Sequence, residues 1–274
     1  MTAEARVSSQ PVLLERLEGG VMTLTLNRPE RLNALSSPLI EALLGAVKRA
    51  GAEPECRAVL ITGAGRGFCA GADLANRAFS PGDARPDLGQ ALENGVNPLI
   101  RGIRNLPKPV VCAVNGPAAG AGANIALACD IVLAAKSAQF LQAFARIGLI
   151  PDAGGTFVLP RLIGEARARA LMMLAEPIGA ERAEAIGMIY RAVDDDDLMG
   201  EAHTIAERLA SGPTHALGLM KRALAASPAN SLDAQLDLER DLQREAGRSD
   251  DYSEGVRAFL DKRPVNFRRK PPEA

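Results

Sequence analysis

Residues 107–134 read PKPVVCAVNGPAAGAGANIALACDIVLA, and this stretch decides the fold class. Two prolines lead into an apolar run at residues 110–114, and a second apolar run follows at residues 131–134. Between these runs we expect a turn at residues 115–117 and a helix of small residues over 120–129. A strand, a helix and a second strand in succession are typical of βαβ units. The chain is therefore predicted to be an α/β protein in which helices cover a sheet.

The same stretch is the most apolar part of the chain, yet we do not expect it to cross a membrane. The turn at 115–117, Asn124 and Asp130 interrupt it, whereas a membrane-spanning helix needs about 20 predominantly apolar residues in succession. Residues 1–10 are polar and mixed in charge, without the basic and then apolar pattern of a signal peptide. These features predict a cytoplasmic protein that binds no membrane.

Composition excludes further classes of partner. The chain has 274 residues, with 32 Lys and Arg against 33 Asp and Glu, a formal net charge of −1, seven Phe, two Tyr and no Trp. Such a chain has no general field to attract polyanions and no platform for stacking bases, so no nucleic-acid partner is expected. Four cysteines without CxxC spacing and two distant histidines indicate reduced, packed thiols and no metal site.

The flanking sequence extends the α/β pattern and then changes it. Before residue 107 we expect a hairpin of residues 12–17 and 21–26, a helix to residue 50 with Ser37 as N-cap and Pro38 at its first position, a strand at 58–62, a mobile surface loop over 75–89 and a helix over 90–105. After Pro160 only helical periodicity is visible, in residues 165–174, 201–210, 214–226, 232–245 and 253–260. These patterns predict a core domain over residues 1–200 and a C-terminal helical region over residues 201–274.

Common nucleotide, metal and hydrolase motifs do not occur in the sequence. The glycine-rich turn at 63–67 is followed by Phe68 and Cys69, where a phosphate-binding loop requires Lys and then Ser or Thr. Residues 120–125 fall short of the dinucleotide-binding pattern, because Ile125 stands at the third glycine position. HExxH and GxSxG motifs are also missing, so other groups must supply the chemistry.

Two stretches rich in glycine and alanine, residues 68–74 and 116–123, are the candidate chemical elements. Small side chains leave the backbone N–H groups uncovered, so a ligand can touch them. Two such groups that converge on one oxygen would form an oxyanion hole. Ordinary tight turns remain the alternative interpretation of both stretches.

Several motifs in a fixed order carry a resemblance to a known family. They are NRPERLNAL at 27–35, FCAGADL at 68–74, PKPV at 107–110, ACDI at 128–131 and IPDAGGT at 150–156. Over about residues 12–267 the chain resembles the crotonase, or enoyl-CoA hydratase/isomerase, superfamily. The resemblance implies a spiral of ββα units with a helical C-terminal region that joins subunits into a homotrimer or a dimer of trimers. It also implies an acyl-CoA substrate and no cofactor.

The resemblance assigns roles to residues of both glycine-rich stretches. It implies that the amides of Ala70 and Ala121 form the oxyanion hole, which would stabilise the enolate left when a thioester loses its α proton. The residues that it places against the substrate or its CoA moiety are Arg31, Leu32, Ala34, Ala70, Gly71, Ala72, Asp73, Leu74, Gly120 and Phe144.

The departures from the family pattern indicate the reaction. Enoyl-CoA hydratases use two glutamates, which align here with Asn124 and Phe144, whereas Asp152 stands where hydratases commonly carry glycine. This combination resembles the phenylacetate-pathway isomerases, which act on ring-epoxidised phenylacetyl-CoA and also shift double bonds in enoyl-CoA. Asp152 is then the candidate general base and acid, since one carboxylate can take a proton from one carbon and return it to another. Asn124 would orient substrate or a water, or only make a helix hydrogen bond.

Rival interpretations keep the fold and change the chemistry. Water addition with Asp152 as a lone catalytic acid, as in enoyl-CoA hydratase, is the first alternative. A module that binds acyl-CoA without turnover is the second, because both glutamates are missing. An aspartate nucleophile attacking an aryl-CoA, as in the related dehalogenases, is a further one. Asp152 could also merely cap the turn before Gly154.

Overall fold

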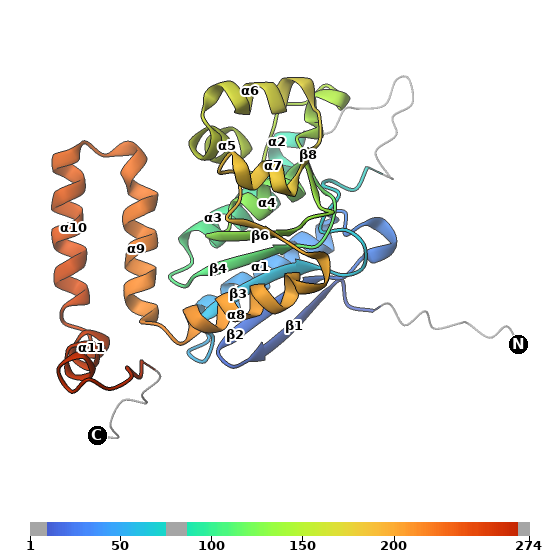
Figure 1. Ribbon diagram of the computed structural model, residues 1–274. Coiled ribbons are helices and arrows are strands. Elements are labelled where there is room, and N and C mark those ends of the chain that lie inside the picture. Colours follow the sequence, from blue (N-terminus) through green and yellow to red (C-terminus); the bar gives the residue numbers. More distant parts are fainter. Residues whose placement is uncertain (1–9, 75–86, 268–274) are drawn as a thin grey trace, which may run out of the picture.

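The computed structural model describes residues 10–74 and 87–267. A six-stranded sheet in the order β1-β2-β3-β4-β6-β9 lies at its centre (Figure 1). The strands are β1 (Leu13–Glu18), β2 (Val21–Leu26), β3 (Ala58–Gly63), β4 (Val110–Val114), β6 (Ile131–Ala135) and β9 (Arg191–Val193). β1 and β2 form an antiparallel hairpin, and each later strand is parallel to its neighbour. The carboxyl ends of the parallel strands therefore meet at one edge of the sheet.

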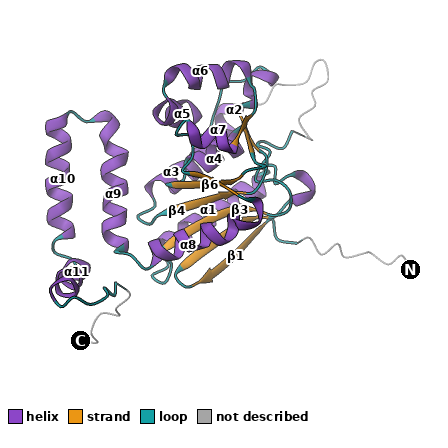
Figure 2. Ribbon diagram, in the orientation of Figure 1, coloured by secondary structure: helices purple, strands orange, loops and turns teal. Residues whose placement is uncertain are grey.

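Helices cover both faces of this sheet. α1 (Ser37–Ala52) and α3 (Asn97–Asn105) lie on one face, and α8 (Leu198–Ala210) lies on the other (Figure 2). All five residues of β4 are buried, as are the first five of β3. Strands that are covered on both faces need apolar side chains at every position, which explains the uninterrupted apolar runs in the sequence.

A fully buried helix and a second sheet follow the turn after β4. The second sheet has the order β5-β7-β8 and consists of β5 (Ala118–Ala119), β7 (Gln139–Leu141) and β8 (Ile178–Gly179). α4 (Ala121–Leu127) follows β5 almost directly, and all of its residues are buried. Because most of these side chains are small, neighbouring segments can approach the helix backbone closely.

The other helices form two groups (Figure 1). α5 (Gly155–Ile163), α6 (Glu165–Leu174) and α7 (Ala180–Ala185) gather at the top of the view, and α9 (Thr214–Ala226), α10 (Leu232–Ala246) and α11 (Asp250–Leu260) stand at the left. Short helical turns are α2 (Leu88–Ala91), the π-helical turn Leu92–Val96 and the 3-10 turns Pro29–Arg31, Ala143–Ile147, Asp195–Asp197 and Ser227–Ala229.

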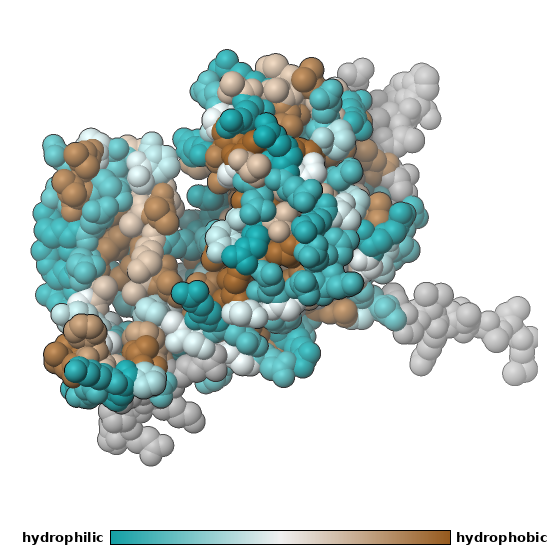
Figure 3. All heavy atoms as spheres, viewed as in Figure 1, coloured by the Kyte–Doolittle hydropathy of each residue, from teal (hydrophilic) through white to brown (hydrophobic). Residues whose placement is uncertain are grey.

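Hydrogen bonds of Lys221 tie the group α9–α11 to the core, and the group carries exposed apolar side chains. Lys221 of α9 donates to Asp130 Oδ2 at 2.7 Å and to the carbonyl of Ile103 at 2.8 Å. Leu232 of α10 is 74% exposed, and Phe259 of α11 is 82% exposed. Figure 3 shows hydrophobic residues on this group, in brown, on the side turned to the reader.

The start of α1 differs by one residue from the expectation. Ser36, and not Ser37, is the N-cap, since its hydroxyl accepts a hydrogen bond from the N–H of Leu39 at 3.4 Å. Pro38 is consequently the second residue of the helix. Two adjacent serines offer equivalent caps in the sequence, and only the path of the chain selects between them.

The remaining expectations for the fold are mostly confirmed. The hairpin, the strands at 58–62, 110–114 and 131–134, and the helices after residue 160 are present, and α2, the π-helical turn and α3 together cover the helix expected over 90–105. After Pro160 no further strand of comparable strength is expected, and the strands found there, β8 and β9, have only two and three residues, too few to show a periodicity. Residues 75–86 of the expected loop lie outside the described residues, and residue 88 begins α2. The boundary expected after residue 200 falls inside α8, which packs on the sheet.

Candidate active site

Two backbone segments that follow β3 and β4 lie side by side. The N–H of Ala119 donates to the carbonyl of Cys69 at 2.9 Å, and Cys69 pairs with Ala118 in a parallel bridge. At Gly71, where φ is +87°, an added Cβ would lie 2.7 Å from the carbonyl oxygen of Ala119. Only glycine combines that backbone conformation with that close approach. Gly71 therefore fixes how closely residues 69–72 approach residues 118–121.

The backbone amides of these segments have different uses. The N–H of Ala70 donates to the carbonyl of Leu32 at 2.9 Å, which joins the segment to the loop after β2. The expectation that Ala70 supplies an oxyanion donor is contradicted, because this N–H already has an acceptor. Among the described residues the N–H groups of Ala72 and Ala121 donate to no acceptor. Ala121 keeps its expected role as a candidate, and Ala72 is a candidate that the sequence motif did not indicate.

An ion pair and a buried asparagine hold the loop expected to bind CoA. Arg28 pairs with Asp73 at 2.9 Å and donates to the carbonyl of Ala34 at 2.6 Å. Asn33, with no exposed surface, donates to the carbonyls of Ala64 and Gly67 at 2.9 and 2.8 Å. Sequence reading missed Arg28 and Asn33, although both lie within the motif at 27–35. The only indication in the sequence is that two polar residues stand in a turn, where their side chains can bind neighbouring segments of the backbone.

The expected substrate-contacting residues separate into accessible and buried groups. Those that are exposed or half-buried are Arg31, Leu32, Ala70, Ala72, Asp73 and Leu74, and those that are buried are Ala34, Gly71, Gly120 and Phe144. The N–H of Leu35 donates to the carbonyl of Gly71 at 2.7 Å, so residues 31–35 and 70–74 lie side by side. The fold thus brings together both motifs that are expected to bind CoA.

Asp152 and Asn124 meet through the backbone. Asn124, on α4, is 1% exposed, and its Nδ2 donates to the carbonyl oxygen of Asp152 at 2.8 Å. The N–H of Gly155 donates to the same oxygen at 2.9 Å. Asp152 is half-buried, and its Oδ1 is screened from solvent. The amide of Asn124 is therefore engaged in holding the turn that carries the carboxyl group.

An aromatic ring occupies the position that the resemblance aligns with the second hydratase glutamate. Phe144, in the 3-10 turn Ala143–Ile147, is 7% exposed. Gly120 has φ +52° and ψ −126°, and a Cβ on it would lie 3.6 Å from Cζ of the Phe144 ring. The ring and the glycine form an apolar wall beside the amide of Ala121, and a phenyl ring can neither bind nor ionise a water.

Cys69 lies beneath the candidate oxyanion hole but is not a nucleophile. Burial raises the pKa of its thiol to about 12, and its Sγ donates to the carbonyl of Asn33 at 3.2 Å. The reactive form of cysteine is the thiolate, which is scarce at neutral pH when the pKa is so high. All four cysteines are buried and unpaired by disulfides. Residues 10–74 and 87–267 contain no group of three His, Cys, Asp or Glu suited to a metal, and none of their helices could span a membrane.

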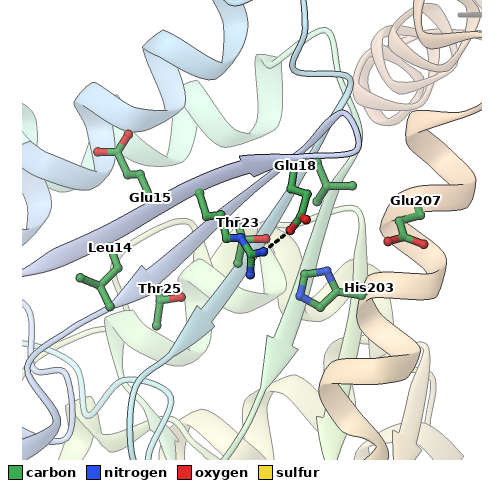
Figure 4. A pocket seen from close by; sticks show the side chains of 9 residues that line it. Leu14, Glu15, Glu18, Thr23, Thr25, His203 and Glu207 are labelled. Carbon is green, nitrogen blue, oxygen red and sulfur yellow. Dashed lines mark ion pairs between the residues drawn. The ribbon is translucent and has the colours of Figure 1, made fainter.

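A separate cavity of about 280 Å³ lies between the β1–β2 hairpin and α8. Figure 4 shows His203 and Glu207 of α8 facing Thr23, Thr25 and Glu18, and Arg16 makes an ion pair with Glu18. None of its lining residues belongs to the turns described above. We therefore locate the candidate active site at the turns after β3 and β4.

Comparison with known proteins identifies the family. The family model for enoyl-CoA hydratase/isomerase matches residues 16–270, so the chain belongs to this family and has the crotonase fold. The 1,2-epoxyphenylacetyl-CoA isomerase of Escherichia coli is 53% identical over 258 residues, which are 94% of this chain and 98% of that protein. Crotonyl-CoA hydratase of Syntrophomonas wolfei is 35% identical, with 93% and 97% covered. The crystal structure of an enoyl-CoA hydratase from Polaromonas superposes with a TM-score of 0.85 at 36% identity, with 93% and 99% covered. The chain is an enzyme of the isomerase/hydratase group, as its motifs predicted.

Substitution of Gly71 tests the close approach of the two segments. Gly71→Ala places a Cβ 2.7 Å from the Ala119 oxygen at a positive φ, so we expect the free energy of unfolding to fall by more than about 1 kcal/mol. Acyl-CoA binding, measured by calorimetry, should weaken as well. The control is Gly200→Ala in α8, where a Cβ meets nothing within 4 Å. Equal stability and equal affinity of Gly71→Ala and wild type would contradict this account.

Proposed function

We propose that this enzyme is an acyl-CoA isomerase that shifts a double bond, or opens a ring epoxide, through a thioester enolate. The observation that carries the proposal concerns the two positions that bear glutamates in hydratases: neither has a carboxyl group in this chain. Asn124 is bound to the backbone of Asp152, and Phe144 is packed beside Gly120. Neither side chain can activate water, whereas the carboxyl group of Asp152 can transfer a proton.

The enolate oxygen would be stabilised by two backbone amides. We assign these to Ala121 and Ala72, with Ala72 replacing the Ala70 of the sequence-based expectation because the Ala70 N–H is donated to Leu32. Preorganised donors at a developing negative charge are among the strongest catalytic devices, and one of them is worth about 3 kcal/mol. Ala72 is exposed and Ala121 is buried, and neither N–H group has an acceptor among the described residues.

Asp152 would carry the proton in both half-reactions. As carboxylate it removes a proton from Cα of a 3-enoyl thioester, and the C–H electron pair moves into the enolate. The dienolate then takes the same proton at Cγ, which moves the double bond into conjugation and restores the carboxylate. One acid/base group suffices because the proton removed equals the proton returned. No metal or redox cofactor takes part in this proposal.

The CoA moiety would lie along the surface formed by residues 31–35 and 70–74. Arg31 and Leu74 are exposed there, and the Arg28–Asp73 ion pair fixes the two strands of chain beneath them. Such a rigid backbone surface lowers the conformational cost of binding a long ligand.

Hydration is the second candidate function. It is supported by the similarity to crotonyl-CoA hydratase. Here Asp152 would act as a lone catalytic acid toward water and a 2-enoyl thioester. Binding of acyl-CoA without turnover is the remaining alternative, and the measurements below separate all three.

We also propose that the enzyme is a homotrimer or a dimer of trimers in the cytoplasm. Exposed apolar side chains on α9–α11, among them Leu224, Leu232, Phe259 and Leu260, support an assembly that covers this face (Figure 3). A groove of about 520 Å³ between α9 and α10 lies on the same group. Contiguous exposed apolar patches on a protein usually mark interfaces. Four buried free thiols are compatible with a reducing compartment.

The role of Asp152 is tested with a 3-enoyl-CoA. Appearance of the conjugated 2-enoyl product reports isomerisation, and Asp152→Asn should reduce kcat by about 100-fold to 10,000-fold, because the amide cannot transfer the proton. Asp196→Asn, at an exposed position of the turn before α8, is the matched control and should have wild-type activity. Full activity of Asp152→Asn would overturn the assignment. Loss of the conjugated absorbance of crotonyl-CoA at a higher rate than isomerisation of the 3-enoyl-CoA would favour hydration. Binding of acyl-CoA without either reaction would favour the inactive module.

Isotope transfer tests whether a single carboxyl carries the proton. A 3-enoyl-CoA deuterated at C2 is converted in ordinary water, and the product is analysed by NMR. We expect part of the deuterium at C4, because Asp152 Oδ1 is screened from solvent and exchange competes with return. Base-catalysed isomerisation without enzyme, in which water carries the proton, is the control. Complete loss of deuterium to solvent would argue for two separate acid/base groups.

Light scattering tests the assembly. We expect a particle mass of three or six times the chain mass of 28.8 kDa. Phe259→Asp combined with Leu260→Asp should shift the mass toward the single chain, because charges in an apolar interface lose their hydration. Arg248→Asp, an exposed residue between α10 and α11, is the control. A wild-type mass of one chain at micromolar concentration would refute the proposal.

A further inference from the structure

Gln142 begins a buried chain of amide groups that ends at the turn of Asp152. Gln142 follows β7 and is 3% exposed, and Asn124 on α4 is 1% exposed. Nε2 of Gln142 donates to Oδ1 of Asn124 at 2.8 Å, and Nδ2 of Asn124 donates to the carbonyl oxygen of Asp152 at 2.8 Å. Two hydrogen bonds thus connect the second sheet, through α4, to the residue that carries the candidate base.

The Asp152 carbonyl, the last acceptor, fixes the donor-to-acceptor direction of these hydrogen bonds. A carbonyl oxygen can only accept, so Asn124 must turn its NH₂ group toward Asp152. Its oxygen then faces Gln142, which must present its own NH₂ group in turn. Reversal of either amide would bring two acceptors face to face in a buried place. The Asp152 carbonyl therefore sets which way both amides face, and loss of Gln142 leaves Oδ1 of Asn124 without the donor that anchors it.

The turn that receives the chain is under conformational constraint. Ala153 and Gly154, directly after Asp152, have φ of +50° and +76°. Left-handed conformations of a residue other than glycine persist only where the surroundings hold them. At Gly155 an added Cβ would lie 2.4 Å from Nδ2 of Asn124. Gly155 therefore leaves room for the Asn124 side chain against the turn. The carbonyl of Asp152 accepts hydrogen bonds from Nδ2 of Asn124 and from the N–H of Gly155.

We propose that Gln142 is a positioning residue for Asp152. Its NH₂ group anchors Oδ1 of Asn124, Asn124 holds the Asp152 carbonyl, and the position of this backbone unit places the carboxyl group. Gln142 itself contacts neither the carboxyl group nor the proposed substrate surface through any hydrogen bond of the described residues. The inference rests on the proposed role of Asp152 as proton carrier and adds to it the means by which that carboxyl is aimed.

The first measurement is the kinetics of Gln142→Met with a 3-enoyl-CoA. Methionine keeps the length and flexibility of glutamine but donates no hydrogen bond. We expect kcat to fall about tenfold to 100-fold, because small displacements of a reacting group have effects of this size, with KM within about twofold of wild type. The matched control is Gln139→Met, at an exposed position of β7, the strand that Gln142 follows, which should change neither constant. A raised KM with unchanged kcat would overturn the proposal.

The second measurement separates positioning from general support of the fold. In an Asn124→Leu enzyme the chain is already broken, so adding Gln142→Met should lower kcat no further. If Gln142→Met lowers kcat by the same factor in both backgrounds, Gln142 does not act through Asn124 and the proposal fails. Gln142→Leu serves as the second variant if Gln142→Met does not fold, with the same outcomes expected.

A third measurement needs no turnover and separates this inference from the proposed function. If wild type converts no acyl-CoA, the proposed function fails, and urea unfolding then tests the chain of amides alone. Partners in one hydrogen-bond network show non-additive effects. We expect the double variant Gln142→Met with Asn124→Leu to be less destabilised than the sum of the single variants. Strict additivity would refute the connection between the two residues.

Discussion

The close approach of residues 69–72 to residues 118–121 is the constraint on which the rest of the site depends. It is held by backbone hydrogen bonds after two parallel strands, and it requires residues without Cβ atoms at the crossing. At Gly71 a Cβ would lie 2.7 Å from the Ala119 oxygen, and at Gly122 it would lie 2.4 Å from the Cys69 oxygen. The N–H groups of Ala72 and Ala121, in these two segments, have no acceptor among the described residues, so a site made of main-chain donors becomes possible.

Polar side chains serve this site mainly by holding backbone in place. Asn33 cross-links the loop after β2 to the turn at 63–67, Arg28 connects that loop to Asp73, and Asn124 holds the carbonyl of Asp152. Each of these side chains donates hydrogen bonds to backbone carbonyls or, in the case of Arg28, also to the carboxylate of Asp73. All of them lie where little solvent reaches. Buried polar groups of this kind are costly unless satisfied, so a satisfied network fixes one geometry. In the proposed reaction a single carboxyl then does the chemistry on a frame that the other residues keep rigid.

Much of the fold follows from local sequence patterns, and the exceptions have physical reasons. Local sequence predicts the buried strands β3 and β4 from their uninterrupted apolar runs. It predicts α9–α11 from their helical periodicity. β8 and β9 have two and three residues, and strands so short exist only because an edge of a sheet is available to them. The N-cap at Ser36 instead of Ser37 is likewise a choice made by the path of the chain.

For the site, the sequence by itself determined the family and the two glycine-rich segments, and its resemblance to hydratases aligned Asn124 and Phe144 with their two glutamates, because residue types and their order carry that information. Only the tertiary structure decided which amides remain available. The N–H of Ala70 donates to the carbonyl of Leu32, and the N–H of Ala72 has no such acceptor among the described residues. Asn124 donates to the Asp152 carbonyl and accepts a hydrogen bond from Gln142. Hydrogen bonds between segments distant in the chain depend on distances and angles in three dimensions, and a linear motif contains neither.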